Sequence, residues 1–520
     1  MAAQHGTRRS QRWLRWGTAA LTGLLSAGAA IAAGEVVAGA VRPASSPILV
    51  VGNRFVTLTP EWLKSFAIRE FGTSDKTALL TGIYLTVGVL AVVIGLLTLH
   101  HIRYATIGMV LFGAVAIYCS FTTAAPHSSD FVPSAIATVV GVLVLLRLYR
   151  ELPGPRPDHA AEDAPDRRTF LVGSAVTAGA ALLATWIGKT WQHSRFSAAP
   201  SRAAVVLPTP ADPAPPLPAN AALGSGGQPF DTSNDDFYRI DIALQVPQIE
   251  AAKWHLEFQG RFDHPTTLTL DDLLKRPMVE RWITLACVSN EVGGDLIGTA
   301  RFQGVLLGPL LRELGVHSDA DQLLARGSDG ATIGVPTAAV LDGRDAMLAV
   351  GMNGEPLPLE HGFPVRMVVP GLYGYVSACK WITQLTATTY RADKAYWVQR
   401  GWTENGAIEL ASRIDVPKQR ARVKIGDRIA IAGIAWHQHV GISAVQVRID
   451  DGPWLPAKLG GVPSTDTWRQ WLLPWTVAGK GGHVVTVRAV DSQGKVQSDD
   501  NRPPYPGASS GWDTLSIYAE

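Results

Sequence analysis

Five apolar stretches in the first 190 residues limit what this part of the chain can fold into. A helix needs about 20 mostly apolar residues to cross the hydrocarbon core of a bilayer. Three stretches reach that length without a charged side chain, and Arg147 could extend the shorter fourth one by snorkelling. We therefore predict a transmembrane helical domain of about five spans over residues 1–190, with the stretches at 18–34, 77–99, 104–125, 131–146 and 169–188.

Basic residues at the ends of these stretches predict how the domain is oriented, because cytoplasmic loops carry an excess of Lys and Arg. Five spans with these residues in the cytoplasm place the chain after residue 188 outside it, in a multi-pass protein of the cell membrane. Arg167 and Arg168 resemble a twin-arginine export signal, although paired arginines also serve as simple topology anchors. The basic residues are Arg8, Arg9, Arg12 and Arg15, then His100, His101 and Arg103, then Arg147, Arg150, Arg156, Arg167 and Arg168.

The rest of the chain predicts a linker and two globular domains. Residues 191–229 are rich in Pro and Ala, which is typical of an extended spacer. Residues 230–415 mix strand and helix patterns without strict alternation, which favours an α+β domain. Residues 416–520 contain short alternating strands and a hairpin signal at Asp451-Gly452, which indicates a β-sandwich. The predicted fold class is thus multi-domain: transmembrane helices, a central α+β domain and a C-terminal sandwich.

Composition narrows the functional classes. A formal net charge of +2 argues against a nucleic-acid partner. The three cysteines, Cys119, Cys287 and Cys379, are too few for a disulfide scaffold, and the absence of a CxxC motif argues against iron–sulfur clusters and c-type haem.

Cys287 is the first candidate for chemistry. It follows a strand pattern at residues 281–286 and enters a loop with Gly293 and Gly294, where a large ligand could approach the backbone. A thiolate there would suit a transition metal. From the residues alone, a buried structural cysteine is the commoner interpretation, and a disulfide with Cys379 is a further alternative.

A second candidate region interleaves glycine and proline with basic residues between residues 342 and 381. It includes His361, Arg366 and Lys380, which could supply fixed cations for a phosphate or a polar heterocycle. The alternative is a set of turns between short strands, with the charges solvated.

At these residues the chain resembles the sulfite oxidase family of molybdopterin enzymes, over residues 230–520. The C-terminal region resembles that family's immunoglobulin-like domain, in Gly433-Ile434-Ala435-Trp436 and Trp468-Arg469-Gln470-Trp471. The motifs that carry the match in the central domain are Leu285-Ala286-Cys287 with Asn290, Ala300-Arg301-Phe302, Met352-Asn353-Gly354, His361-Gly362-Phe363-Pro364-Val365-Arg366 and Lys380-Trp381-Ile382.

The resemblance implies roles for single residues. Cys287 would bind molybdenum beside the dithiolene of molybdopterin, while Tyr373 and Arg239 would lie on the substrate side. The sequence departs from sulfite-oxidising members at Glu291 and Val292, where they carry basic residues, and at 349–351, where they carry a tyrosine. Tyr373 and Tyr375 are candidates to replace that tyrosine. The implied cofactor-binding residues are Asn290, Arg301, His361, Arg366 and Lys380.

The function expected from the resemblance is two-electron oxygen-atom transfer by a membrane-anchored molybdenum oxidoreductase. The expected partners are a small oxyanion or sulfur-oxide substrate, an electron-transfer partner, the membrane, and a second copy through the C-terminal domain. Two alternatives remain: a sulfoxide-type reductase on the same cofactor, and a cofactor-free membrane-tethered binding module.

Overall fold

The computed structural model describes residues 2–60, 63, 66, 70, 75–123, 125–152, 167–224 and 226–520. Arg156 and the side chains of Arg8, Arg9 and Arg12, which entered the predicted orientation, lie outside this description. The chain divides into two compact units: unit 1 is Met1–Ser197 with Ile242–Val246, and unit 2 is Ala198–Asp241 with Pro247–Glu520.

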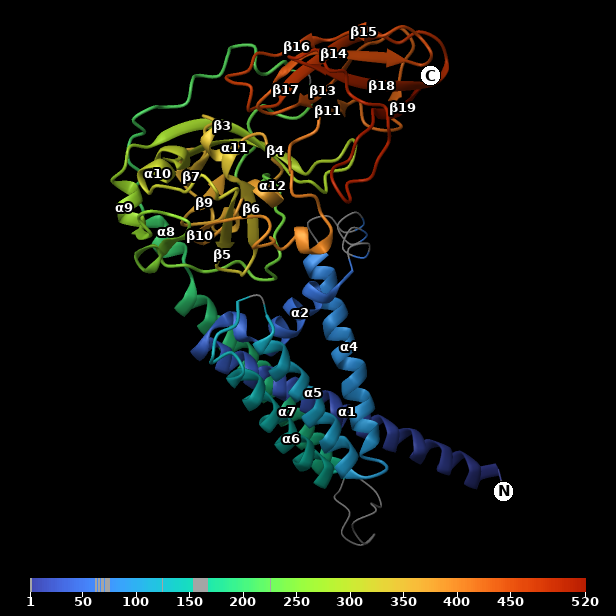
Figure 1. Cartoon of the computed structure of the whole chain (residues 1–520). Coiled ribbons are helices and arrows are strands. Elements are labelled where there is room, and N and C mark those ends of the chain that lie inside the picture. The colour runs from blue at the N-terminus through green and yellow to red at the C-terminus, as the bar shows by residue number, and fades with distance from the viewer. Residues whose placement is uncertain are drawn as a thin grey trace. The chain divides into compact units, whose positions relative to one another are not determined.

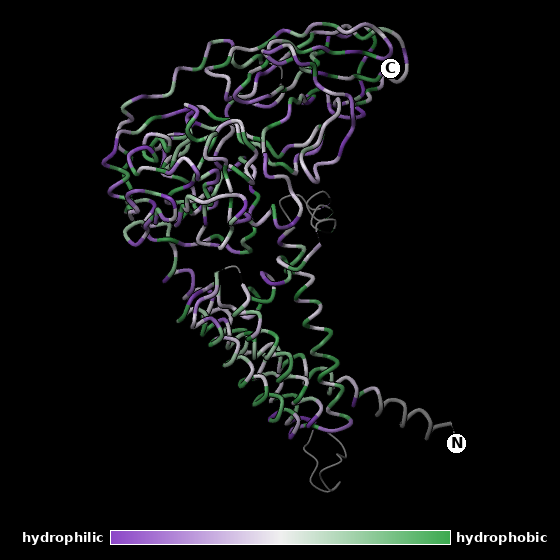
Figure 2. The backbone as a smooth tube through the Cα atoms, viewed as in Figure 1, coloured by the Kyte–Doolittle hydropathy of each residue, from purple (hydrophilic) through white to green (hydrophobic). Residues whose placement is uncertain are grey.

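Unit 1 is a bundle of apolar helices, and Figure 2 shows their hydrophobic residues in green along most of their length. Five helical segments are long and apolar enough to cross a membrane: Trp13–Val41, Lys76–Leu97, Ile102–Phe121, Val132–Arg150 and Arg167–Ala203. The five predicted stretches all fall within or next to them. The helices are α1 (Ala2–Val41), α2 (Pro47–Leu58), α4 (Asp75–Leu97), α5 (Ile102–Phe121), α6 (Val132–Arg150) and α7 (Arg167–Phe196).

Small residues let the helices of unit 1 approach closely. The helix α1 packs against α4, α6 and α7, and α5 packs against α6 (Figure 1). A Cβ on Gly23 of α1 would lie 1.9 Å from the carbonyl oxygen of Ala91 in α4, so this crossing requires glycine. The helix α2 was not predicted, because its 12 residues are too few to span a membrane. Pro47 at its first position is also typical of a loop, although proline is well tolerated at the start of a helix.

Unit 2 contains two sheets that form its α+β part. One has the order β2-β1-β10-β5-β6, and the other has β3-β4-β7-β8, with β9 paired to β7. The first sheet consists of β1 (His255–Gly260), β2 (Thr266–Thr269), β5 (Gln322–Gly327), β6 (Thr332–Pro336) and β10 (Ile382–Thr388). The second consists of β3 (Val279–Ala286), β4 (Ile297–Leu306), β7 (Met347–Met352), β8 (Glu355–Pro356) and β9 (Arg366–Val368). The helices are α8 (Ala199–Ala203), α9 (Leu270–Leu274), α10 (Leu307–Glu313), α11 (Thr337–Leu341) and α12 (Gly374–Ser377).

The C-terminal region forms two sheets over a common core. One sheet has the order β11-β13-β17-β16 and the other β12-β19-β18-β14-β15. Ile431 and Trp471 of the first sheet and Val485 and Ile517 of the second are fully buried in one cluster, as the alternating pattern predicts. The strands are β11 (Ala411–Val416), β12 (Arg422–Val423), β13 (Arg428–Trp436), β14 (Ile442–Ile449), β15 (Leu455–Pro456), β16 (Lys458–Leu459), β17 (Arg469–Thr476), β18 (Gly481–Asp491) and β19 (Asp513–Ala519).

The Pro-rich stretch is not a detached spacer between residues 208 and 223, and this corrects the expectation from composition. The carbonyl of Pro208 accepts a hydrogen bond from Gln303 Nε2 at 2.6 Å, and the amide of Ala211 donates to the carbonyl of Met278 at 2.8 Å. The amide of Leu223 donates to Gln470 Oε1 at 2.8 Å. The backbone N–H and C=O groups of an extended segment have no partners within the segment, and here residues of unit 2 form hydrogen bonds with several of them.

Candidate active site

Cys287 follows β3 directly, as predicted, and the backbone of the next residues closes a small loop around it. Its amide donates to the carbonyl of Leu296 at 2.9 Å, and its carbonyl accepts from the amide of Asn290 at 3.1 Å. Asn290 Oδ1 accepts from the amide of Leu296 at 2.8 Å, so this side chain shapes the loop. All three cysteines are free. Burial raises the pKa of the Cys287 thiol, with hydrogen bonds from Ser289 acting in the opposite direction. Metal binding would remove that proton.

Two tyrosines lie close enough to Cys287 to interact with its charge. Burial raises the pKa of Tyr238 and of Tyr373 far above the ordinary value, and a negative charge on Cys287 raises both further. Both phenols therefore stay protonated and can donate hydrogen bonds. The substrate-side role of Tyr373 that the resemblance implies stays a prediction, and the structure shows only its electrostatic interaction with Cys287. Sequence reasoning missed Tyr238, although it directly precedes the predicted Arg239.

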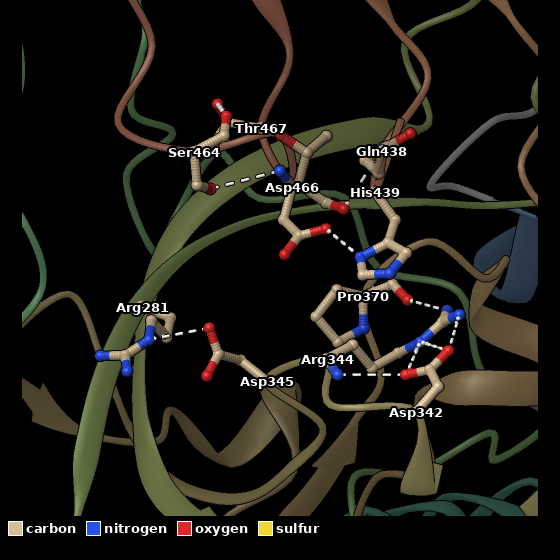
Figure 3. A network of polar contacts seen from close by, with 11 residues as sticks. Arg281, Asp342, Arg344, Asp345, Pro370, Gln438, His439, Ser464, Asp466 and Thr467 are labelled. Carbon is tan, nitrogen blue, oxygen red and sulfur yellow. Dashed lines mark hydrogen bonds and ion pairs between the residues drawn. The ribbon is translucent and has the colours of Figure 1, made fainter. Parts of the chain in front are cut away.

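The loop that precedes Tyr373 lies against residues of both the α+β part and the C-terminal part of unit 2, and Figure 3 shows the hydrogen bond from Arg344 to Pro370 and the neighbouring His439. Arg344 donates to the carbonyl of Pro370 at 2.7 Å and pairs with Asp342 at 2.6 Å. A Cβ on Gly371, which has φ +81°, would lie 2.9 Å from Cβ of His439. His439 comes from the C-terminal region and pairs with Asp466 at 3.3 Å (Figure 3).

Arg366 carries a buried positive charge. Its side chain lies over the Phe302 ring at 5.6 Å, and Nη1 donates to the carbonyl of His361 at 3.2 Å. Its Nε is buried without a hydrogen-bond partner. Among the residues that the structure describes, no carboxylate forms an ion pair with Arg366. Burial lowers the pKa of Arg366 to about 10, so the guanidinium still carries its charge at neutral pH.

His361 lies beside Arg366 and is neutral. Burial lowers the pKa of His361 to about 4, and the positive charge of Arg366 acts in the same direction. Its Nε2 lies 2.9 Å from the carbonyl oxygen of Asn234, so Nε2 carries the proton and Nδ1 is left as an acceptor. Asn234 belongs to the segment that precedes Arg239, and sequence reasoning did not single it out.

Arg239 and Lys380 meet at one carboxylate. Asp241 Oδ2 lies 2.9 Å from Arg239 Nε and 2.9 Å from Lys380 Nζ. Lys380 also lies over the Trp381 ring at 4.6 Å. Behind this cluster, burial raises the pKa of Asp329 to about 6; the charge of Asp241 adds to that, whereas Lys380 opposes it. Neither aspartate was predicted, because Lys380, which interacts with both, is distant from them in sequence.

Arg301 borders a cavity of about 410 Å³. Its Nε lies 3.1 Å from Glu280 Oε1 and makes no hydrogen bond, so the contact is an ion pair without hydrogen-bond geometry. The amide of Arg301 donates to Asn353 Oδ1 at 2.9 Å, and Asn353 Nδ2 donates to Asn234 Oδ1 at 2.9 Å. The residues lining the cavity are Asp231, Ser233, Asn234, Asp235, Trp282, Arg301, Asn353 and Glu355.

The structure thus brings most of the predicted site together. Electrostatic interactions or hydrogen bonds connect Cys287, Tyr373, Arg239, His361, Arg366 and Lys380 through Tyr238 and Asp241, and Arg301 joins through Asn353 and Asn234. The side chain of Asn290 accepts a hydrogen bond from the loop backbone at Leu296 and is not part of this group of interacting residues.

The donors present fit an anionic cofactor that carries its own metal ligands. Arg366 offers an uncompensated buried charge, and burying such a charge is costly unless an anion pairs with it. Among the described residues no group of three His, Cys, Asp or Glu side chains could hold a metal ion, so a metal at Cys287 would need other ligands from the cofactor itself.

Comparison with known proteins gives the family. Residues 243–397 match the family model described as an oxidoreductase molybdopterin binding domain. The mitochondrial sulfite oxidase of Drosophila melanogaster is 30% identical over 361 residues, which are 59% of this chain and 61% of that protein. The uncharacterized oxidoreductase YuiH of Bacillus subtilis is 32% identical over 162 residues, which are 31% of this chain and 78% of that protein. The chain belongs to the sulfite oxidase family of molybdopterin oxidoreductases.

Membership in the sulfite oxidase family makes the chain an oxidoreductase whose cofactor is molybdenum held by molybdopterin. The chain spans 56–61% of the length of the sulfite oxidases from fly, mouse and human that it matches. A crystal structure of the sulfane dehydrogenase SoxCD from Paracoccus pantotrophus is similar over 57% of this chain and 85% of that chain, with 25% identity and a TM-score of 0.49.

Proposed function

We propose that the chain is a membrane-anchored oxidoreductase that transfers an oxygen atom in a two-electron reaction, with Cys287 as the protein ligand to molybdenum. The observation that carries the proposal is Arg366, a buried cation with an unpartnered Nε and no carboxylate partner among the described residues. It lies beside neutral His361 and interacts with Tyr238, which in turn interacts with Cys287.

Each residue has a role that its surroundings support. The molybdopterin-bound metal supplies the oxygen-atom and electron chemistry. Arg366 and Lys380 would hold the negatively charged cofactor, and His361 offers a neutral acceptor at Nδ1. Cys287 would bind the metal as a thiolate. Arg301 and Asn290 complete the proposed cofactor-binding set, Arg301 from the wall of the 410 Å³ cavity and Asn290 by fixing the loop of Cys287.

Tyr373 and Tyr238 orient the substrate. Both phenols remain protonated at neutral pH because burial raises their pKa values. Each can donate a hydrogen bond to an oxygen atom on the substrate near Cys287. Arg239 provides the charge that attracts an oxyanion, although Asp241 at 2.9 Å offsets part of it.

The substrate class that we propose is a small sulfur oxyanion or sulfur oxide. The fly and human relatives are named sulfite oxidases. The loop after Cys287 carries Glu291 and Val292, where the family resemblance leads us to expect basic residues in a sulfite-oxidising enzyme. Together with the offset of Arg239 by Asp241, this departure supports a less charged substrate than sulfite. A sulfoxide-type reductase on the same cofactor is the second candidate.

The helices of unit 1 are proposed to anchor the enzyme as a multi-pass protein of the cell membrane, with the catalytic domain outside the cytoplasm. The two sheets of the C-terminal region, which begin with β11 at Ala411, are proposed to form an immunoglobulin-like sandwich through which two copies pair. The proposed domains are 1–190, 191–229, 230–415 and 416–520. An electron-transfer partner completes the reaction.

A substrate screen on the purified full chain tests the proposal. The protein is produced in a host that makes molybdopterin, its molybdenum is measured, and sulfite, other sulfur oxyanions and sulfoxides are offered with artificial electron acceptors and donors. We expect molybdenum near one atom per chain and turnover of a sulfur compound. Cys287→Ser should abolish turnover and keep the fold, whereas Cys379→Ser should cost little. Protein without molybdenum would instead support a cofactor-free binding module.

A further inference from the structure

Two arginines of the C-terminal region stand side by side on the outer face of one sheet. Arg448 lies on β14 and Arg488 on β18, and these two strands pair with each other. Their neighbours Val447 and Val487 are fully buried in the core between the sheets. Because successive side chains of a strand point to opposite faces, both arginines point away from that core.

A pair of tryptophan rings holds the two guanidinium groups. Trp454 and Trp512 pack edge to face at 5.1 Å between ring centres. The guanidinium carbon of Arg448 lies 5.0 Å from the centre of the Trp454 ring, and that of Arg488 lies 4.1 Å from it. Both carbons lie 5.7 Å from the centre of the Trp512 ring. Two positive charges are therefore held close together around the same two rings.

No carboxylate compensates these two charges within the part of the chain that the structure describes. Neither Arg448 nor Arg488 forms an ion pair there. Stacking on an indole ring stabilises a guanidinium, but it leaves the repulsion between the two like charges in place. A bound anion would remove that repulsion.

The cluster has donors that a ligand can reach. Arg488 Nε already donates to Gln446 Oε1 at 2.8 Å, and Arg448 Nε is buried, so neither of these nitrogens would contact a ligand. The terminal nitrogens Nη1 and Nη2 of both arginines and Nε1 of Trp454 are not buried, and they make no hydrogen bond to a described residue. Such a set of donors requires a ligand that accepts hydrogen bonds and carries negative charge.

We propose that this cluster binds a small tetrahedral oxyanion, of the class of sulfate and phosphate. Such an ion has more acceptor oxygens than a carboxylate and can therefore use more of these donors. Its double negative charge also matches the two guanidinium groups, whose planar forks suit oxyanions. The tryptophan rings keep the donors in place before the ion binds.

Sulfate is the member of this class that we favour, and this choice rests on the proposed function. Gly511, which precedes Trp512, lies against the loop that follows Cys287, because a Cβ on Gly511 would lie 3.5 Å from Cγ2 of Val292. A sulfur oxyanion of the proposed reaction would therefore find these donors beside the segment that contacts the catalytic loop.

Equilibrium dialysis of radioactive sulfate against the detergent-purified full chain with its cofactor tests the proposal at constant ionic strength. We expect saturable binding. Arg448→Gln and Arg488→Gln should each weaken it about tenfold or more, the loss typical of charge-assisted hydrogen bonds. Trp454→Phe keeps a ring, removes the N–H donor and should weaken binding severalfold. The matched control is Arg428→Gln, at an exposed position of the other sheet, which should bind sulfate as the unaltered protein does.

Competition identifies the ligand. Phosphate should displace sulfate, whereas acetate at the same concentration should compete far less. Tighter binding of phosphate than of sulfate would overturn the choice of sulfate. Absence of saturable binding, unchanged binding in both arginine variants, equal loss in Arg428→Gln, or equal competition by acetate would each overturn the oxyanion site.

Arg448→Gln is the variant least expected to disturb the fold, because Arg448 makes no hydrogen bond to a described residue. Circular dichroism checks the fold of each variant. The molybdenum content is measured alongside, because sulfate binding at the cluster in a protein without molybdenum would support the site and refute the proposed enzyme.

Discussion

Arg366 shows at the scale of one residue how the site prepares for an anion. Its guanidinium is buried and its Nε has no partner, so the protein without cofactor bears the cost of an uncompensated charge. A bound phosphate or dithiolene would compensate that charge. The same cost explains why His361, next to Arg366, is kept neutral.

Replacing Arg366 separates stability from cofactor binding. Arg366→Met keeps a similar volume and removes the buried charge, so the cofactor-free protein should become more stable by about 1–4 kcal/mol. The molybdopterin content of protein made in a competent host should fall at least severalfold. Thermal unfolding and cofactor extraction measure the two effects. Arg428→Met, at an exposed position of the C-terminal sheet, should change neither. A variant that keeps full cofactor content would argue against the role of Arg366.

Asp329 should make stability depend on pH with a definite sign. Burial raises its pKa from 3.8 to about 6, so the folded state binds more protons than the unfolded state between these values. The contribution of Asp329 to the free energy of unfolding is therefore complete below pH 3.8 and is lost as the pH rises through 6. Asp329→Asn should raise the apparent Tm above pH 6, by the equivalent of about 1–3 kcal/mol, and much less at pH 4.5. A difference that grows toward acid pH would contradict this assignment.

At the scale of elements, the segment that carries Tyr238 and Arg239 packs closely on β4 because one residue of that strand is glycine. A Cβ on Gly298 would lie 2.8 Å from the ring of Phe237. That ring has little room to move, because it stacks on Tyr238 at 5.3 Å and packs edge-on against His361 at 5.5 Å.

Gly298→Ala should therefore displace Phe237 and with it Arg239. We expect turnover with an artificial electron acceptor to fall at least tenfold, while the far-ultraviolet circular dichroism stays unchanged. Gly482→Ala is the control, since a Cβ there would make ordinary contact with Tyr518 at 3.6 Å. Equal activity in the two variants would show that the seating of Phe237 does not matter.

Local patterns predicted many elements correctly. The strand predicted at residues 281–286, directly before Cys287, is the end of β3, and the alternating pattern after residue 416 gives the strands of the C-terminal sheets. The sequence could not supply contacts across large separations, such as Lys380 with Asp241, 139 residues apart. The hydrogen bonds between the Pro-rich stretch and Met278 and Gln303 were not predicted for the same reason. The composition of a segment does not indicate which surface the segment will pack against.

At the scale of the whole molecule, the proposed topology places unit 2 outside the cytoplasm. The basic residues at the helix ends motivate it, with five segments that can span. Alkaline phosphatase, which folds only outside the cytoplasm, should be active when it is fused at Gly224. A fluorescent protein fused at the same residue should not fluoresce. A fusion at His100, between the second span, which ends at Leu97, and the third, which begins at Ile102, should behave in the opposite way. A cytoplasmic signal at Gly224 would refute the topology.

The central claim is that Cys287 binds molybdenum, and X-ray absorption at the molybdenum edge tests it most directly. The full chain is compared with Cys287→Ser, both purified from a host that supplies molybdopterin. A thiolate ligand and the dithiolene both contribute sulfur neighbours at the metal. We predict that Cys287→Ser loses one sulfur ligand while the dithiolene sulfurs remain. Identical sulfur coordination in the two proteins would contradict the account.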